Sequence, residues 1–429
     1  MTHLRSSVLN ILLSVGTLAV LLTATELALS IRLALKPSAP HRTQLIHERE
    51  EFLSQKYGPL IAEKPERGWD NSLVLHPFFG YVYNPDLPTA NNFGFLCRYD
   101  FGLSEKGYSL TGVTAADPLV VGVFGGSFAQ YMVEQTADYF TAKLRQLYPQ
   151  REPVIVNFAI AGHAIPQTIF TFEYFRGIPD VAVFVDGFNE IMNYPGNNRA
   201  GVPPEYAKAA HYLYKLSLGL LTPDRFERTA HIIALRHRLA RITATSLWPG
   251  VRRSIAVHLA WAAAVRVWEA DLAAESKALE LGFETDKRFF DASDAAMVTI
   301  AARQWRNYHR LASQVAASRG VADYHFLQPN PFVPGSKRHY TALEREALEP
   351  GRGEEEQALV LGYSLIGREL EALSRQDGAV ARDLTKVFLN DDGEIWVDTC
   401  HANAAGYRIV VDAIVRTMVE HGTVAKRGQ

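Results

Sequence analysis

A short turn near the C-terminus carries an acid and a base at a spacing suited to catalysis. Asp398 lies three residues before His401 in the stretch Asp-Thr-Cys-His. In a turn, this spacing lets the carboxylate hold one ring nitrogen of the histidine while the other nitrogen faces outward. A serine becomes a useful nucleophile only when such a base takes its proton, so the pair predicts the base and its orienting acid.

Ser127 is the candidate nucleophile. It follows Gly125 and Gly126 at the end of 119–124, a run rich in β-branched residues, and apolar residues then recur at helical spacing as far as Leu147. A strand, a tight turn, a serine and a helix place one hydroxyl at a helix N-terminus, where free N–H groups and the helix dipole favour negative charge. Taken alone, this geometry suits an activated serine, a bound anion or a simple helix cap.

Two other strand ends offer hydrogen-bond donors. Gly162 comes shortly after the strand-like run 154–159, and Asn189 follows the run 181–185. Loops at the carboxyl ends of adjacent parallel strands converge on one place. We therefore expect the N–H groups of Ser127 and Gly162 and the side-chain amide of Asn189 to lie together, where they would stabilise an oxyanion.

Strand and helix signals alternate over most of the chain. The pattern predicts strands at 119–124, 154–159, 181–185, 323–327 and 379–388, and helices at 128–147, 166–175, 295–318 and 354–374. This alternation is typical of an α/β fold with a parallel, doubly wound sheet in three layers. From about 203 to 290 the sequence is rich in Ala, Leu and Arg with few strand signals, which indicates a helical insertion.

The N-terminus is strongly apolar. Residues 8–25 are about the minimum length for a membrane helix, and residues 27–35 can extend it. Glu26 and Arg32 then fall toward the far end of this helix, where they can reach the interface. A cleaved signal peptide is the alternative, but no clean small-x-small site precedes the charged flank, so we expect an uncleaved anchor. Only Arg5 precedes the run, whereas three basic residues follow it, and the positive-inside rule alone would keep the large domain in the cytoplasm.

These features divide the chain into three segments. We expect a membrane anchor at 1–36, a membrane-proximal spacer with lead-in strands at 37–112, and an α/β domain at 113–429 that contains the helical insertion. With 48% hydrophobic and 21% charged residues, the chain has ample material for a core. Its net charge of −2 and the lack of a long basic run argue against a nucleic-acid partner.

The sequence offers little for a metal or nucleotide. The glycine pair before Ser127 lacks G-x-G-x-x-G spacing and no phosphate-loop lysine follows it, and no histidine cluster accompanies Asp186 and Glu190. The two cysteines, Cys97 and Cys400, have no zinc spacing. A disulfide between them would brace the catalytic turn and imply an oxidising compartment, and two buried thiols are the alternative.

Four segments, in chain order, resemble the sequence blocks of the SGNH/GDSL hydrolases. They are Gly-Gly-Ser-Phe at 125–128, the glycine at 162, Gly-Phe-Asn-Glu at 187–190 and Asp-Thr-Cys-His at 398–401. The resemblance implies that Ser127 attacks, that His401 is the base and that Asp398 orients it. It also implies an oxyanion hole made by the N–H groups of Ser127 and Gly162 with the Asn189 amide.

The chain departs from the family pattern at two positions. Gly126 replaces an aspartate that is common before the serine, and Glu190 replaces the usual aspartate after the asparagine. Neither position carries the chemistry that the resemblance implies. The α/β-hydrolase elbow G-x-S-x-G is not matched, because Ala129 stands where its second glycine would be.

The resemblance implies a serine esterase without metal or nucleotide. Membrane-tethered bacterial members of the family often act on acyl or acetyl groups of envelope glycans or lipids, so we expect a single-pass inner-membrane protein with a periplasmic catalytic domain. The alternatives are an O-acyltransferase using the same triad and a non-catalytic glycan-binding or assembly protein of the envelope.

Overall fold

The computed structural model describes residues 23–32, 42–61, 72–105, 107–207, 223–281, 288–351 and 353–421. The chain forms two compact units, a helical one from Met1–Asn71 with Leu221–Gly282 and an α/β one from Ser72–Leu220 with Phe283–Gln429. This division differs from the three expected segments. The lead-in strands belong to the α/β unit, and most of the expected insertion shares a unit with the N-terminal segment.

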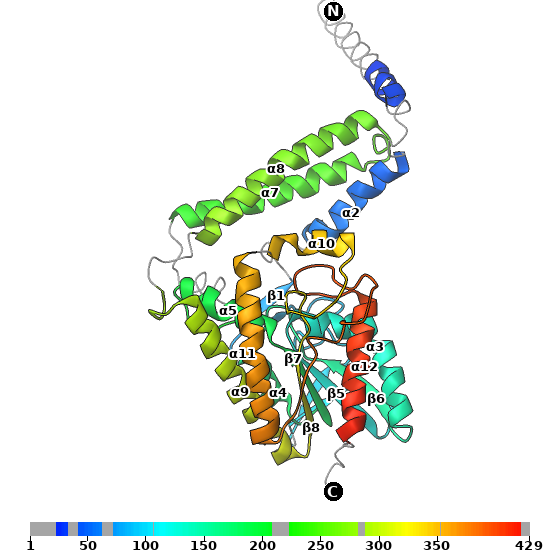
Figure 1. Cartoon of the computed structure of the whole chain (residues 1–429). Helices are drawn as coiled ribbons and strands as arrows, with labels where there is room; N and C mark the ends of the chain where they lie inside the picture. Colours follow the sequence, from blue (N-terminus) through cyan, green and yellow to red (C-terminus); the bar gives the residue numbers. More distant parts are fainter. Residues whose placement is uncertain are drawn as a thin grey trace, which may run out of the picture. The chain divides into compact units, whose positions relative to one another are not determined.

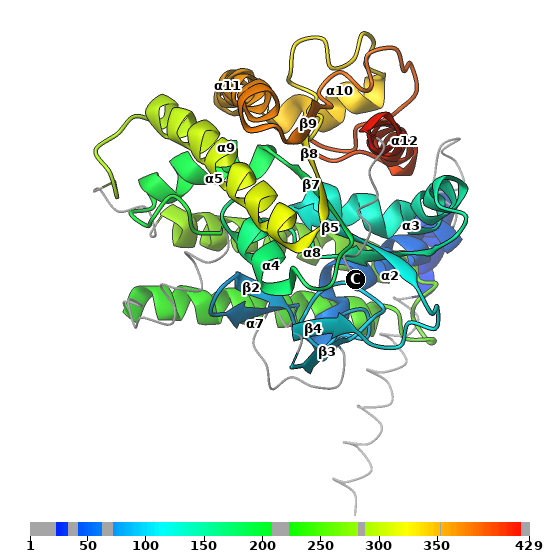
Figure 2. The ribbon, with the colours of Figure 1, turned by 90° about the horizontal axis from the view of Figure 1, so that it is seen from below.

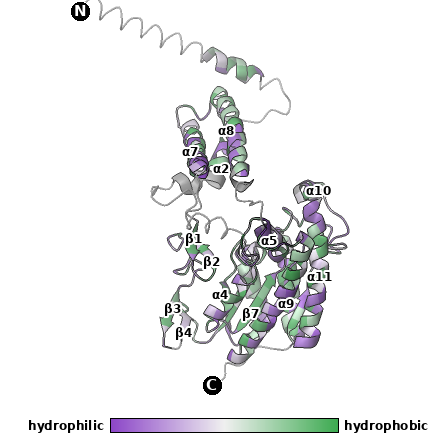
Figure 3. Cartoon of the chain, turned by 90° about the vertical axis from the view of Figure 1, so that its left-hand side faces the viewer, coloured by the Kyte–Doolittle hydropathy of each residue, from purple (hydrophilic) through white to green (hydrophobic). Residues whose placement is uncertain are grey.

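A five-stranded parallel sheet is the framework of the α/β unit (Figure 1). Its strand order is β6-β5-β7-β8-β9. The strands span Pro118–Gly125 (β5), Glu152–Asn157 (β6), Val181–Asp186 (β7), Ala322–Leu327 (β8) and Val380–Asp383 (β9). Strand β7 is buried at every residue and hydrophobic in Figure 3, as expected of a strand covered on both faces. The predicted parallel sheet is confirmed, although β9 ends earlier than expected.

Helices cover both faces of this sheet. They span Ser127–Leu147 (α3), Gln167–Phe175 (α4), Phe188–Arg199 (α5), Asp294–Arg319 (α9), Ala342–Leu348 (α10), Glu354–Asp377 (α11) and Ala404–His421 (α12), with a 3₁₀ turn at Glu349–Gly351. Figure 2 shows α3 and α12 on one side of the sheet and α4, α5, α9 and α11 on the other. Helix α3 buries Phe128, Met132, Phe140 and Leu144, so its apolar stripe faces inward as its periodicity predicts.

The lead-in strands do not join the main sheet. Strands β1 (Leu73–His76) and β2 (Gly80–Tyr83) form one antiparallel pair, and β3 (Phe101–Ser104) and β4 (Gly107–Leu110) form another. They are held by aromatic packing instead. Phe175 at the end of α4 lies 5.5 Å from the ring of Phe95, measured between centroids, and 5.0 Å from that of Phe101.

The helical unit contains α2 (Arg42–Ile61), α7 (Pro223–Ser246), α8 (Ile255–Leu281) and a helix at residues 23–32. Its core centres on Trp261, whose ring meets that of Phe52 at 5.5 Å between centroids. The indole N–H of Trp261 donates to Thr243 Oγ at 2.9 Å, so the one polar group of this ring is satisfied in the core.

Within the described ranges, no helix is both long and apolar enough to cross a membrane. Of the expected anchor at residues 1–36, only residues 23–32 lie within those ranges. The anchor therefore stays a prediction.

Candidate active site

The strand order brings the predicted donors and the predicted nucleophile to one end of the sheet. Strand β5 lies between β6 and β7, so the connections from β5 and β6 run in opposite directions along the sheet. This switch point is where ligands bind in open α/β sheets. Ser127 follows β5, Gly162 follows β6 and Asn189 follows β7.

Ser127, His401 and Asp398 form a continuous chain of hydrogen bonds. Ser127 Oγ lies 2.7 Å from His401 Nε2, and His401 Nδ1 lies 2.7 Å from Asp398 Oδ2. Because the carboxylate accepts from Nδ1–H, Nε2 carries a lone pair and accepts from the serine hydroxyl. This is the tautomer in which a histidine removes a proton from a serine.

The turn around Asp398 fixes its carboxylate. Asp398 Oδ1 accepts from the N–H groups of Cys400 at 2.8 Å and of His401 at 2.7 Å. Burial acts to raise the pKa of Asp398, but the hydrogen bonds from the His401 ring and the Cys400 N–H outweigh it, so the pKa lies below its ordinary value. The carboxylate is therefore charged at neutral pH and would stabilise a positive charge on the His401 ring.

A buried ion pair between Lys337 and Glu344 of α10 holds the segment that enters this turn. Glu344 Oε1 accepts from the N–H groups of Ile395 at 2.9 Å and Trp396 at 3.1 Å. Lys337 Nζ lies 2.6 Å from the same oxygen, and both side chains are fully buried. A buried pair of this kind is costly to break, so it keeps the turn in place.

The amide of Asn189 lies beside the residue before the nucleophile. A Cβ at position 126 would lie 2.2 Å from Asn189 Nδ2. The Asn189 amide can therefore lie this close to the backbone only because residue 126 is glycine. Asn189 Nδ2 also donates one hydrogen to the carbonyl of His163 at 2.6 Å. The second amide hydrogen remains for another acceptor, since an amide carries two donors.

Gly162 has a backbone that suits glycine. Its φ is +80°, and a Cβ there would lie 2.4 Å from the hydroxyl of Tyr81. That hydroxyl donates to the carbonyl of Ala161 at 2.6 Å. Within the described part of the chain, neither the N–H of Ser127 nor that of Gly162 donates to a hydrogen-bond acceptor. Two N–H groups and one amide hydrogen are thus available for an oxyanion.

Helix α5 is fastened to the loop that carries Gly162. Glu190 is fully buried, and its two oxygens accept from the N–H groups of Ile165 and Gly187, each at 2.8 Å. Asn193, one turn further along, donates to the carbonyl of Gly162 at 3.2 Å. Burial raises the pKa of Glu190 to about 8, with the Asp186 carboxyl adding to the effect. Glu190 and Asn193 therefore connect the two sides of the expected oxyanion hole.

Sequence reasoning missed these supporting residues. The sequence marks Glu190 as a departure from a family pattern and as a carboxylate without a metal-binding histidine cluster, but a glutamate three residues after Gly187 also has the spacing of a capping box. Gln130, one turn after the nucleophile, accepts through Oε1 from the Ala161 N–H at 2.8 Å and the Tyr83 hydroxyl at 2.9 Å. No local signal singles it out, because its partners are remote in sequence.

His163, the residue after Gly162, is a buried and uncharged histidine. It is buried, and its Nε2–H donates to the carbonyl of Tyr81 at 3.0 Å. Burial lowers the pKa of His163 to about 4, so the ring is neutral at physiological pH. Its role here is to pack the Gly162 loop against β2.

The disulfide that the sequence left open is not formed. Cys97 and Cys400 are both buried thiols. Cys400 Sγ lies 3.4 Å from His401 Nδ1 and 3.7 Å from Nε2, whereas Cys97 Sγ accepts from the Tyr99 N–H at 3.4 Å. The two sulfurs are held by different neighbours, so a bridge between them would require the packing of both to change.

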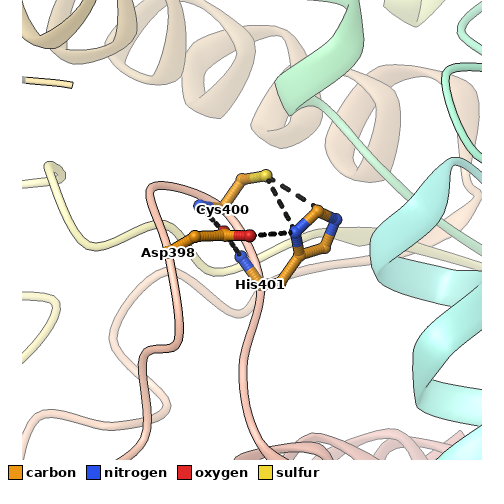
Figure 4. A group of neighbouring side chains, drawn as sticks. All are labelled: Asp398, Cys400 and His401. Atoms are coloured by element: carbon orange, nitrogen blue, oxygen red, sulfur yellow. Dashed lines mark hydrogen bonds and ion pairs between the residues drawn. The ribbon is translucent and has the colours of Figure 1, made fainter. Parts of the chain in front are cut away.

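Asp398, Cys400 and His401 lie close enough together to resemble a metal site (Figure 4). Their ligand atoms all lie within 4.8 Å of one another. The Cys400 sulfur is almost equally far from both ring nitrogens, so it does not lie along the lone pair of either one. Both ring nitrogens are also engaged, with Asp398 and Ser127. These contacts fit a proton relay and do not fit a set of metal ligands.

Comparison with known proteins finds no relative by sequence. No family model matches the chain, and no curated protein matches it. Among solved structures, the chain is similar to the acetyl xylan esterase AlAXEase, with 15% identity over 71% of this chain and 100% of that one and a TM-score of 0.33. It is also similar to LAE5, an alpha/beta hydrolase from the metagenome of Lake Arreo, Spain, with 9% identity, coverage of 71% and 96%, and a TM-score of 0.33. Likenesses this weak carry no argument about function.

Proposed function

We propose that this protein is a serine ester hydrolase of the SGNH/GDSL type. The observation that carries the proposal is the hydrogen-bonded chain from Ser127 Oγ through the His401 ring to Asp398, with 2.7 Å at each step. The order of the four sequence blocks, and the placement of the first three after β5, β6 and β7, support the family assignment. The family's three-layer arrangement agrees with helices on both faces of the sheet.

In the first half of the reaction, Ser127 Oγ attacks the ester carbonyl carbon while its proton moves to His401 Nε2. Asp398 stabilises the imidazolium that results. The carbonyl oxygen becomes an oxyanion, which accepts from the N–H groups of Ser127 and Gly162 and from the Asn189 amide. When the C–O bond to the leaving group breaks, the imidazolium gives its proton to the departing alcohol and an acyl-serine remains.

In the second half, water takes the place of the alcohol. His401 removes a proton from the water, whose oxygen attacks the acyl carbon, and the same donors hold the second oxyanion. Collapse of this intermediate releases the carboxylic acid and returns the proton to Ser127 Oγ. The chain's own residues supply every proton transfer in this scheme.

We further propose that the substrates are acyl or acetyl esters of envelope glycans or lipids. The support is the apolar run at residues 8–25, which would hold the catalytic unit at a membrane. The same run motivates the proposal of an inner-membrane location with a periplasmic catalytic unit.

The test is hydrolysis of a short-chain aryl ester together with labelling by a serine-reactive phosphonate. Ser127→Ala should lower kcat by at least about 10⁴-fold and abolish labelling, because the nucleophile is lost. Ser109→Ala, an exposed position in β4, is the matched control and should change neither. Unchanged thermal melting of the Ser127→Ala variant would show that the fold is intact. A wild-type protein inert to both reagents would contradict the proposal.

A further inference from the structure

The turn between α7 and α8, residues 247–254, presents one large aromatic ring and two cations to solvent. Trp248 is 68% exposed, whereas Trp261, Trp305 and Trp396 are buried. Arg252 and Arg253, in the same turn, are also exposed. An exposed tryptophan beside arginines is the composition found where proteins lie at the membrane–water interface.

Two arginines of α2, one buried and one exposed, hold the backbone of this turn. Arg49 on α2 is fully buried and donates to the carbonyls of Ser246, at 3.0 Å, and Arg252. Arg42 donates to the carbonyl of Arg253 at 3.3 Å. These backbone carbonyls are therefore satisfied from within the helical unit, while the side chains of Trp248, Arg252 and Arg253 stay exposed.

Glu26 connects this turn to the apolar N-terminal run. Its Oε1 accepts from the Ile255 N–H at 2.9 Å, and its Oε2 accepts from Ser254 Oγ at 2.8 Å and the Ala256 N–H at 3.1 Å. Glu26 thus caps the first turn of α8, where a carboxylate is favoured. Glu26 is also the first residue after the run 8–25, so its side chain links the end of that run to the α7–α8 turn.

We propose that the α7–α8 turn is a membrane-contact surface that binds anionic lipid. A carboxylate is costly in hydrocarbon, so Glu26 places the end of the apolar run in the interface, and its hydrogen bonds bring the turn to the same depth. There Trp248 lies among the headgroups, and Arg252 and Arg253 meet lipid phosphates. The proposed contact rests on the proposed membrane location of the apolar run at residues 8–25 and not on the proposed hydrolase activity.

The test uses the full chain reconstituted into vesicles of brominated phosphatidylcholine, with or without phosphatidylglycerol. The emission of Trp248 is obtained by subtracting the spectrum of Trp248→Phe from that of the wild type. In anionic vesicles we expect this emission to shift to the blue and to fall about twofold relative to unbrominated lipid, because the ring lies in the interface. Vesicle-bound protein whose Trp248 emission is neither shifted nor quenched would overturn the proposal.

Two variants test the lipid and the place of contact. Arg252→Gln with Arg253→Gln should reduce the quenching in anionic vesicles and leave it unchanged in neutral ones, whereas equal quenching in every case would overturn the role of anionic lipid. Phe226→Ala is the matched control, since Phe226 is exposed but lies near the start of α7, roughly 30 Å along the helix from Trp248. Its substitution should leave the quenching unchanged, and an equal loss there would contradict a contact confined to the turn.

Discussion

At the scale of single residues, the candidate site depends on a few atoms held at hydrogen-bond distance. Asp398 uses one carboxylate oxygen for its own turn and the other for the His401 ring. The thiol of Cys400 lies against that ring without replacing either partner. The orientation of the imidazole is therefore set by Asp398, and replacing this residue should lower the rate strongly.

Asp398→Asn should lower kcat about 10³–10⁴-fold with little change in KM, because an amide favours the wrong tautomer of His401. Steady-state kinetics with an aryl ester would measure it, and a loss of less than about tenfold would contradict the assigned role. The pKa of Asp398 lies below its ordinary value, so this carboxylate stays charged above about pH 4. A fall in wild-type rate between about pH 7 and 5 would therefore not come from protonation of Asp398.

Gly126→Ala should impair catalysis through the Asn189 amide. The added methyl would lie 2.2 Å from Asn189 Nδ2, while φ of −91° at this position suits alanine, so the effect is steric and not conformational. Displacing one oxyanion donor costs about 10²–10³-fold in kcat. Gly196→Ala on α5 is the control, since a Cβ there meets nothing within 4 Å. Equal kinetics of the two variants would contradict the placement of Asn189.

At the scale of elements, helix α5 connects the residues of the expected oxyanion hole. It presents Asn189 toward Gly126, and it holds the Gly162 loop through Glu190 and Asn193. Helix α10 does the same for the Asp398 turn through Glu344. Positioning thus comes from buried side chains that bind backbone groups of a neighbouring loop.

Glu190→Gln should lower kcat while leaving KM nearly unchanged. Glutamine offers one acceptor oxygen to the two N–H groups of Ile165 and Gly187, so one donor is left unpaired and the Gly162 loop shifts. We expect a loss of about 10–100-fold in kcat, and about 1–3 kcal/mol in unfolding free energy. Glu371→Gln, at an exposed position of α11, should change neither quantity. A stability loss without any change in kcat would show that Glu190 is structural only.

At the scale of the whole molecule, the candidate site is assembled from segments that span most of the α/β unit. Ser127 and His401 are 274 residues apart in the chain and meet because α12 packs on α3. The interior beneath them contains titratable groups, including His163, His309 and Glu190. Their burial links the stability of the fold to pH.

His163→Gln should make the protein less sensitive to acid. Burial lowers the pKa of His163 to about 4, so between about pH 4 and 6.5 the unfolded chain binds a proton at this position that the native state does not. Wild-type stability is therefore lost as pH falls through this window, by up to about 1.4 kcal/mol per pH unit from this residue. Urea unfolding at several pH values would measure the difference between the two proteins. A difference that is constant with pH would contradict the buried, neutral state of His163.

The sequence by itself determined the features that are local. The β-branched runs and the helical periodicity predicted the five strands of the sheet and its main helices to within a few residues in most cases. The spacing of Asp398 and His401, and the position of Ser127 after β5, predicted which residues to bring together. The strand and helix predictions succeed because strands and helix starts are decided mostly by neighbours in the chain.

Only the tertiary structure decided what depends on contacts between distant segments. It separated Cys97 from Cys400, kept the lead-in strands out of the main sheet, and showed why glycine stands at position 126. It also revealed Glu190 as the link between α5 and the Gly162 loop. The physical reason is that a buried polar group takes whichever partner the packing brings to it, and that partner is often far away in the sequence.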